Sequence, residues 1–236
     1  MNTFLRMRAT ARLAVCAAVA AGALFPADSF AERMSEKEQD AFFIAAKSDM
    51  GGAVLEPLIR KCNNLRDSDV PLCSKDRKGL IMKRLSGSIG PINYTMTTHT
   101  KKVTLPHGFK QAFGKYKTLM RLGHAKAYAE AGAFVFAETM KGEFGMDDRC
   151  AFKYFQKAAQ AGDIDGAFMY AFCLYYGIGS SAANQTPDRR KACEVLVAMK
   201  KKIDGDATKS STASKLLSSG WVARRLAEAG TVLCRK

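Results

Sequence analysis

The sequence has little of what catalysis usually requires. Its 236 residues include three histidines and a single tryptophan. They contain no His-Glu-x-x-His, no Gly-x-Ser-x-Gly and no Gly-rich phosphate loop followed by Lys-Ser or Lys-Thr. His99, His107 and His124 stand in unrelated local contexts, and cysteines that are paired in disulfides are inert as nucleophiles. We therefore expect a protein that is not an enzyme and that needs no cofactor.

Long apolar runs are also lacking. The only marked one covers residues 13–25 (LAVCAAVAAGALF), which is shorter than the roughly 20 apolar residues of a membrane-spanning helix. Three arginines precede it, and the small side chains of Ser29 and Ala31 follow it. This order is typical of a secretory signal peptide. We expect residues 1–31 to be removed by cleavage and the mature protein to be exported, not membrane-spanning. A membrane anchor, or a lipid anchor at Cys16, is the alternative.

The cysteine spacing does not fit a zinc site. Structural zinc ligands come in pairs separated by about two to four residues, and no gap between cysteines here is that short. We therefore expect no bound metal. After residue 31 an even number of cysteines remains, which favours disulfides in an exported chain. The candidates are Cys62, Cys73, Cys150, Cys173, Cys193 and Cys234. Cys62 and Cys73 form the most plausible local pair, because the residues between them have the composition of a turn.

Acidic residues are in the minority, and the chain carries a net charge of +15. Removal of residues 1–31, with their three arginines and one aspartate, leaves +13. A basic surface attracts acidic partners, such as anionic lipid headgroups, lipopolysaccharide, acidic wall polymers or an acidic protein face. No zinc-finger, RRM or KH motif occurs and the Lys and Arg residues are scattered, so we expect no specific nucleic-acid partner.

Strand signals are nearly absent, and apolar residues recur with helical spacing between glycines. Helices are expected at 36–47, 54–62, 75–85, 110–122, 125–141, 148–161, 164–176, 187–203 and 212–229. Ser35 and Glu38 match a capping box at the first of these. Residues 88–106 are Thr-rich, have prolines near both ends (Pro91 and Pro106) and lack a helical apolar stripe, so they predict an ordered loop or a short extended excursion. The sequence thus predicts an all-α protein, with a helical region at 32–106 and a second at 107–236.

Two stretches of the second region echo each other. Gly123-His-Ala-Lys-Ala precedes Gly162-Asp-Ile-Asp-Gly by 39 residues, and small side chains recur on one helical face after each glycine. The segment 147–179 (DDRCAFKYFQKAAQAGDIDGAFMYAFCLYYGIG) has an Asp, an Ala, an aromatic pair, Lys-Ala-Ala, a Gly and a helix ending in Gly-x-Gly. This series resembles a Sel1-like repeat, a variant of the tetratricopeptide superfamily. One unit is well matched and is flanked by two degraded ones over about 123–200.

The resemblance implies stacked antiparallel helical hairpins in a short solenoid, with an N-terminal helical extension and a C-terminal cap. Helix 164–176 is apolar nearly all round and should be covered on both sides. Helix 212–229 suits the cap, with Trp221 packed inward. In this hairpin arrangement Cys150 and Cys173 come level with each other, and Cys193 and Cys234 pair by default. Cysteine-rich relatives usually carry Cys where Ala159 and Ala167 stand, so their disulfide scheme does not carry over.

The resemblance also implies a function. Helical repeats bind peptides or partner domains on an extended concave surface. The aromatic candidates for this surface, which otherwise form the core, are Tyr128, Phe134, Phe168 and Tyr176. We expect an exported scaffold or adaptor, in the periplasm or secreted, that binds protein partners of the bacterial envelope and possible anionic polymers. An exported hydrolase acting on cell-wall material and a secreted factor that engages host molecules are the alternatives.

Overall fold

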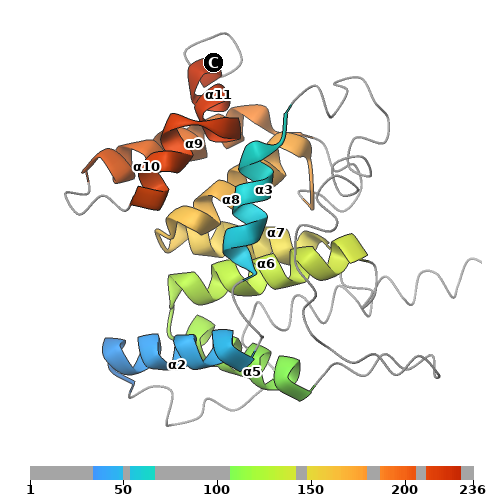
Figure 1. The fold of residues 1–236 in the computed structure, drawn as a ribbon, viewed down its shortest axis with the longest axis vertical. Helices are drawn as coiled ribbons and strands as arrows, with labels where there is room; N and C mark the ends of the chain where they lie inside the picture. The colour runs from blue at the N-terminus through green and yellow to red at the C-terminus, as the bar shows by residue number, and fades with distance from the viewer. Residues whose placement is uncertain are drawn as a thin grey trace, which may run out of the picture.

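The computed structural model describes residues 34–49, 54–66, 107–141, 148–179, 187–205 and 211–229 (Figure 1). The predicted signal peptide, the helix expected at 75–85, the Thr-rich segment, Cys73 and Cys234 lie outside these residues. The helices are α2 (Glu36–Asp49), α3 (Leu55–Asn64), α5 (His107–Arg121), α6 (Ala125–Lys141), α7 (Asp148–Gln160), α8 (Ile164–Tyr176), α9 (Arg189–Gly205), α10 (Ser211–Ser218) and α11 (Gly220–Ala229). The described residues contain no strand, so the all-α prediction is confirmed. None of these helices is long and apolar enough to cross a membrane.

The structure divides one of the predicted helices into two. The sequence predicts a continuous helix over 212–229, whereas the structure breaks it between α10 and α11. Gly220 has a φ of 78°, and a Cβ placed there would lie 2.5 Å from the backbone oxygen of Asn63. A glycine is needed because it adopts this left-handed conformation without a steric penalty and lets the two backbones approach. The remaining described helices agree with their predicted ranges to within a few residues.

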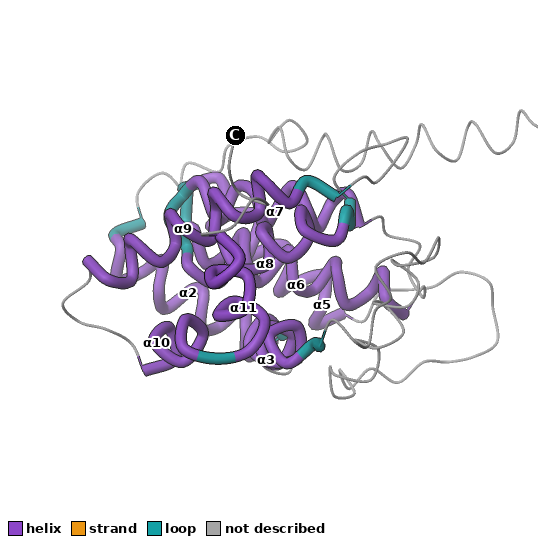
Figure 2. Tube along the Cα trace, turned by 90° about the horizontal axis from the view of Figure 1, so that it is seen from above, coloured by secondary structure: helices purple, strands orange, loops and turns teal. Residues whose placement is uncertain are grey.

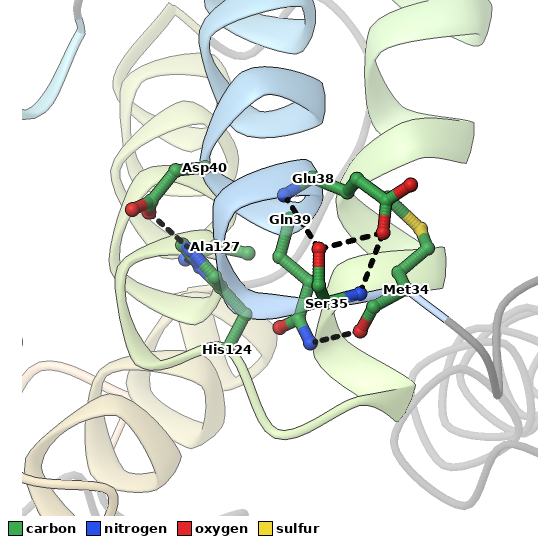
Figure 3. A network of polar contacts seen from close by, with 7 residues as sticks. All are labelled: Met34, Ser35, Glu38, Gln39, Asp40, His124 and Ala127. Atoms are coloured by element: carbon green, nitrogen blue, oxygen red, sulfur yellow. Dashed lines mark hydrogen bonds and ion pairs between the residues drawn. The ribbon is translucent and has the colours of Figure 1, made fainter.

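The first described helix begins at the predicted capping box, which is drawn in Figure 3. The Ser35 backbone N–H donates to the Glu38 carboxylate over 2.7 Å, and the Glu38 N–H donates to the Ser35 hydroxyl oxygen over 3.4 Å. Each side chain therefore satisfies an amide that has no partner inside the helix. The Ser35 hydroxyl also donates to the same carboxylate, over 2.7 Å.

The two glycines that head the echoed stretches make the same turn. Gly123 and Gly162 have φ values of 79° and 85°. Each glycine N–H, and the N–H that follows it, returns to carbonyls of the preceding helix, the pattern that closes a helix on a left-handed residue. The next side chain then begins the following helix. His124 Nδ1 accepts from the Ala127 N–H at 3.2 Å, and Asp163 accepts from the Gly166 N–H at 2.6 Å.

From α5 to α11 successive helices pack against each other, and α8 lies at the centre. It contacts α6, α7, α9 and α3, with α7 and α9 on one side and α3 and α11 on the other (Figure 2). From Gly166 to Tyr176, all residues of α8 except Ala167 are buried, as expected for a helix that is apolar all round. Trp221 of α11 is fully buried against it, and its Nε1–H donates to the Tyr176 hydroxyl at 3.0 Å. The inward packing of Trp221 is confirmed.

Small residues bring the helices close, as the spacing predicts. A Cβ added to Gly132 of α6 would lie 2.7 Å from the Phe155 ring of α7. A Cβ added to Gly166 of α8 would overlap that of Ala158 of α7. No side chain other than hydrogen fits at either position, so these glycines set the distances from α6 to α7 and from α7 to α8.

The helices that precede residue 107 join the same core. α2 packs on α5, while α3 packs on α6, α8 and α11. Glu130 of α6 links both: it pairs with the Lys47 amine of α2 at 3.3 Å and accepts from the Leu55 N–H, at the start of α3, over 3.3 Å. Burial raises the pKa of Glu130, and Lys47 opposes that shift. This buried carboxylate therefore holds three helices together through one side chain.

Candidate functional site

The aromatic residues proposed for a binding surface belong to the core instead. Phe134, Phe168 and Tyr176 are at most 5% exposed, so no partner reaches them. Tyr128 is half-buried, and its hydroxyl donates to the Met120 carbonyl oxygen at 2.7 Å. In a closely packed helical array, large and mainly apolar side chains of this kind fill the space between helices.

Two predicted disulfide pairings are also corrected. Cys62 and Cys173 carry free thiols and are fully buried. Neither the pairing of Cys62 with Cys73 nor that of Cys150 with Cys173 is therefore formed in the structure. Cys150 and Cys193 are each disulfide-bonded. Cys62 lies on the face of α3 that is buried in the core.

The accessible concave feature is a groove between α7 and α9, over the start of α8. It encloses a cavity of about 520 Å³, which is within the usual size range of binding sites. Its lining residues are Gln156, Ala159, Gln160, Gly162, Asp163, Ile164, Ala167, Tyr170, Lys191, Val195, Ala198, Met199 and Lys202. The floor is mainly apolar, whereas amides and ammonium groups lie on the two walls. We call this feature the α7–α9 groove.

The turn after α7 shapes one end of the groove. Gly162 ends α7 and exposes its carbonyl oxygen, which accepts a hydrogen bond from the Lys202 ammonium of α9. A Cβ at Gly162 would lie 2.7 Å from that ammonium. On the α7 wall, Gln156 donates to the Tyr170 hydroxyl over 3.3 Å. These contacts join all three helices around the cavity and fix the positions of its polar groups.

Two carboxylates at the start of α8 are held in unfavourable surroundings. Burial raises the pKa of Asp163, which lines the groove, and the nearby Lys126 and Lys202 partly offset this shift. Burial, together with the charges of Asp163 and Glu130, raises the pKa of Asp165 to about 6. Asp163 is fixed by its role as the cap of α8, so this negative charge at the groove is structural.

Basic charge is concentrated on alternate helices. In α9 the basic residues are Arg189, Arg190, Lys191, Lys200, Lys201 and Lys202, against the acidic Glu194 and Asp204. α5 carries four basic residues and no acidic one, and α7 carries three and one. α6 has two of each sign, and α8 has only the acidic Asp165. Both walls of the α7–α9 groove therefore come from helices with an excess of positive charge.

The histidine among the described side chains has a structural role. His124 Nδ1 accepts from the Ala127 N–H, and Nε2 faces an Asp40 oxygen at 3.4 Å (Figure 3). Its ring packs on Phe43, with the ring centroids 5.1 Å apart. The described residues contain no group of three or more His, Cys, Asp or Glu side chains placed to hold a metal ion.

The described residues thus form an all-helical protein with a polar-walled groove between α7 and α9. Comparisons with known proteins add no family to this description: no protein-family model, no curated protein and no solved structure matches the chain. The groove itself was not predicted. Its residues are ordinary Gln, Ala, Val and Lys side chains on three helices, and only the packing of α7 and α9 on α8 brings them together.

Proposed function

We propose that the chain is an exported, non-catalytic scaffold of the bacterial envelope that binds an acidic segment of a partner protein in the α7–α9 groove. The observation that carries this proposal is the groove, an apolar floor between two basic helices. Apolar contacts with the floor supply affinity, and the lysines on the rim favour acidic side chains in a partner.

The turns at Gly123 and Gly162 support a repeat architecture of the Sel1-like kind. They share their backbone conformation, their hydrogen bonds to the preceding helix and a capping side chain at the next residue. Equivalent turns at an interval of 39 residues are what a repeat sequence produces. Stacked helical repeats bind partners on extended concave surfaces, and in this proposal the α7–α9 groove is part of such a surface.

Export is part of the same proposal and rests on the order of charge, apolar run and small residues in 1–31. The disulfide-bonded state of Cys150 and Cys193 suits an oxidising compartment such as the periplasm.

The test uses two neighbouring residues of α9. Ala198 lines the groove, whereas Val197 does not and is 50% exposed. Both are accessible, so a large side chain at either position leaves the core intact. We would immobilise the mature, oxidised protein and the variants Ala198→Trp and Val197→Trp, expose them to envelope extracts at moderate salt, and identify the retained molecules by mass spectrometry.

The proposal expects one defined envelope protein to be retained by the wild type and by Val197→Trp, and to be lost with Ala198→Trp. A partner that Ala198→Trp retains equally well excludes the groove as its binding site. If only lipopolysaccharide or wall fragments are retained, and less of them as the salt concentration is raised, the protein binds anionic polymers nonspecifically and the scaffold proposal is wrong.

A further inference from the structure

The interface between α3 and α8 contains two thiols. Cys62 and Cys173 are each 0% exposed and are the free cysteines among the described residues. Cys62 belongs to the buried face of α3 together with Leu58 and Ile59. Cys173 lies in the middle of the buried stretch of α8. Both cysteines therefore project into the core from helices that pack together, with Cα atoms of the two helices within 8 Å.

The residues beside the two cysteines meet at the same part of α11. Next to Cys62, the Asn63 side-chain oxygen accepts from the Val222 N–H at 3.1 Å. Next to Cys173, the Phe172 ring packs on Trp221 with 5.3 Å between ring centroids. Because Trp221 and Val222 are consecutive, the two cysteine positions converge on one corner of the core.

The two thiols also interact with each other. Burial raises the pKa of both, and a charge on Cys62 raises the pKa of Cys173 further. That interaction crosses from α3 to α8, between residues separated by 111 positions in the sequence. By contrast, Cys150 and Cys193 are already disulfide-bonded, so Cys62 and Cys173 are each other's available partner within the described part of the chain.

We propose that Cys62 and Cys173 form a disulfide that fastens α3 to α8. The bond joins α3, which lies outside the Sel1-like repeats, to α8, the central helix of the array. Its occurrence in the cell rests on the proposed export, because only an oxidising compartment supplies the necessary oxidant. The chemistry of the pair does not depend on export.

Formation of the bond is a two-electron thiol–disulfide exchange. One cysteine thiolate attacks a disulfide of the oxidant, forming a mixed disulfide and releasing one oxidant sulfur as a thiol. The second cysteine thiolate attacks the protein sulfur of that mixed disulfide and displaces the other oxidant thiol. The two thiol protons and two electrons of the cysteines end on the two oxidant thiols. In the cell the oxidant is the disulfide of an envelope thiol oxidase, and in the test it is glutathione disulfide.

Burial decides when the exchange takes place. The thiolate is the attacking species, and burial of Cys62 and Cys173 suppresses ionisation and access alike. Exchange therefore occurs during folding, before α3 is fully docked. Once docked, a reduced pair reacts slowly and an oxidised pair resists reduction. We expect folded, reduced protein to be alkylated far more slowly at these two positions than unfolded protein.

The experiment refolds the reduced, unfolded chain in a glutathione redox buffer, blocks remaining thiols under denaturing conditions, and maps peptides without reduction. We expect a cross-linked peptide pair containing Cys62 and Cys173. In the matched variant Cys62→Ala, Cys173 should appear as an alkylated thiol. Two quantitatively alkylated thiols in the wild type, or a bond from either cysteine to a different one, overturn the proposal.

A thermal measurement keeps the test informative if a variant packs poorly. A bond that closes a loop of this length should raise the melting temperature of the oxidised wild type by roughly 5–15 °C over Cys62→Ala. Cys173→Ala should lose a similar amount, and the double variant little more than either, because each single change already removes the bond. If the double variant loses the sum of the two single losses in melting temperature and no cross-linked peptide is found, the two cysteines contribute only separate packing and the proposed bond is wrong. None of these readouts depends on partner binding, so the scaffold proposal can fail independently.

Discussion

Replacement of Gly166 by alanine tests the close approach of α7 and α8. The added Cβ would lie closer than 3 Å to the Ala158 Cβ, an approach that real Cβ atoms essentially never show, and 3.2 Å from the Asp163 carboxylate. The Ala158 Cβ is attached directly to a helical backbone and cannot rotate away. Relief therefore requires α7 and α8 to separate, until the two carbons reach an ordinary contact of about 3.5–4.0 Å.

Overpacking of this kind destabilises by about 1–3 kcal/mol. Alanine also has a better helix propensity than glycine, by up to about 1 kcal/mol, which opposes the loss. Gly114→Ala provides this second contribution alone, because a Cβ there meets nothing within 4 Å. We expect Gly114→Ala to stabilise by about 0.4–1 kcal/mol, and Gly166→Ala to destabilise relative to the wild type.

The single tryptophan is a suitable probe for this comparison, because Trp221 is fully buried in the folded protein. Urea unfolding followed by its fluorescence gives the free energy of unfolding of each variant. A Gly166→Ala protein as stable as Gly114→Ala would refute the argument that this glycine sets the distance between the helices.

Three further predictions concern stability. Glu130→Ala leaves the half-buried Lys47 and the first amide of α3 without their partner, and should lower the free energy of unfolding by about 2–4 kcal/mol. Glu56→Ala removes an exposed ion-pair member of α3 and should change this free energy by less than about 1 kcal/mol in the same denaturation assay. The Asp165 pKa of about 6 lies above the unfolded value of about 3.9, so its favourable contribution is present near pH 4 and is lost as the pH rises through about 6. Asp165→Asn should therefore be more stable than the wild type at pH 7, by about 1–2 kcal/mol. An Asp165→Asn protein whose stability has the same pH dependence as the wild type between pH 4 and 7 would show this reasoning to be wrong. Gly220→Ala should destabilise by at least about 2 kcal/mol, from its left-handed backbone and the clash with α3, whereas Gly205→Ala, which adds a Cβ in open space, should be neutral or stabilising in thermal melts.

Helices and their ends were predictable because the signals are local. Ser35 and Glu38 are three residues apart, so the capping box needs no other part of the chain. Gly123 and Gly162 end helices through bonds to residues just before them. The apolar character of α8 required a covered position, and the structure has it.

The break between α10 and α11 has only a weak local signal. Ser219-Gly220 is a dipeptide that often marks a turn, but the apolar residues on both sides of it continue a helical pattern. The conformation of Gly220 is explained by Asn63, which lies 157 residues earlier in the chain and occupies the space where a Cβ would be.

The sequence by itself determined the helical elements, their caps and the excess of positive charge, because each follows from neighbouring residues or from composition. Tertiary packing alone decided that Cys62 and Cys173 are buried thiols, that Phe134 and Phe168 are core residues, and that a groove lies between α7 and α9. Those outcomes depend on which faces of distant helices are brought together. A pattern along one helix identifies its apolar face, but it does not identify the helix that covers that face.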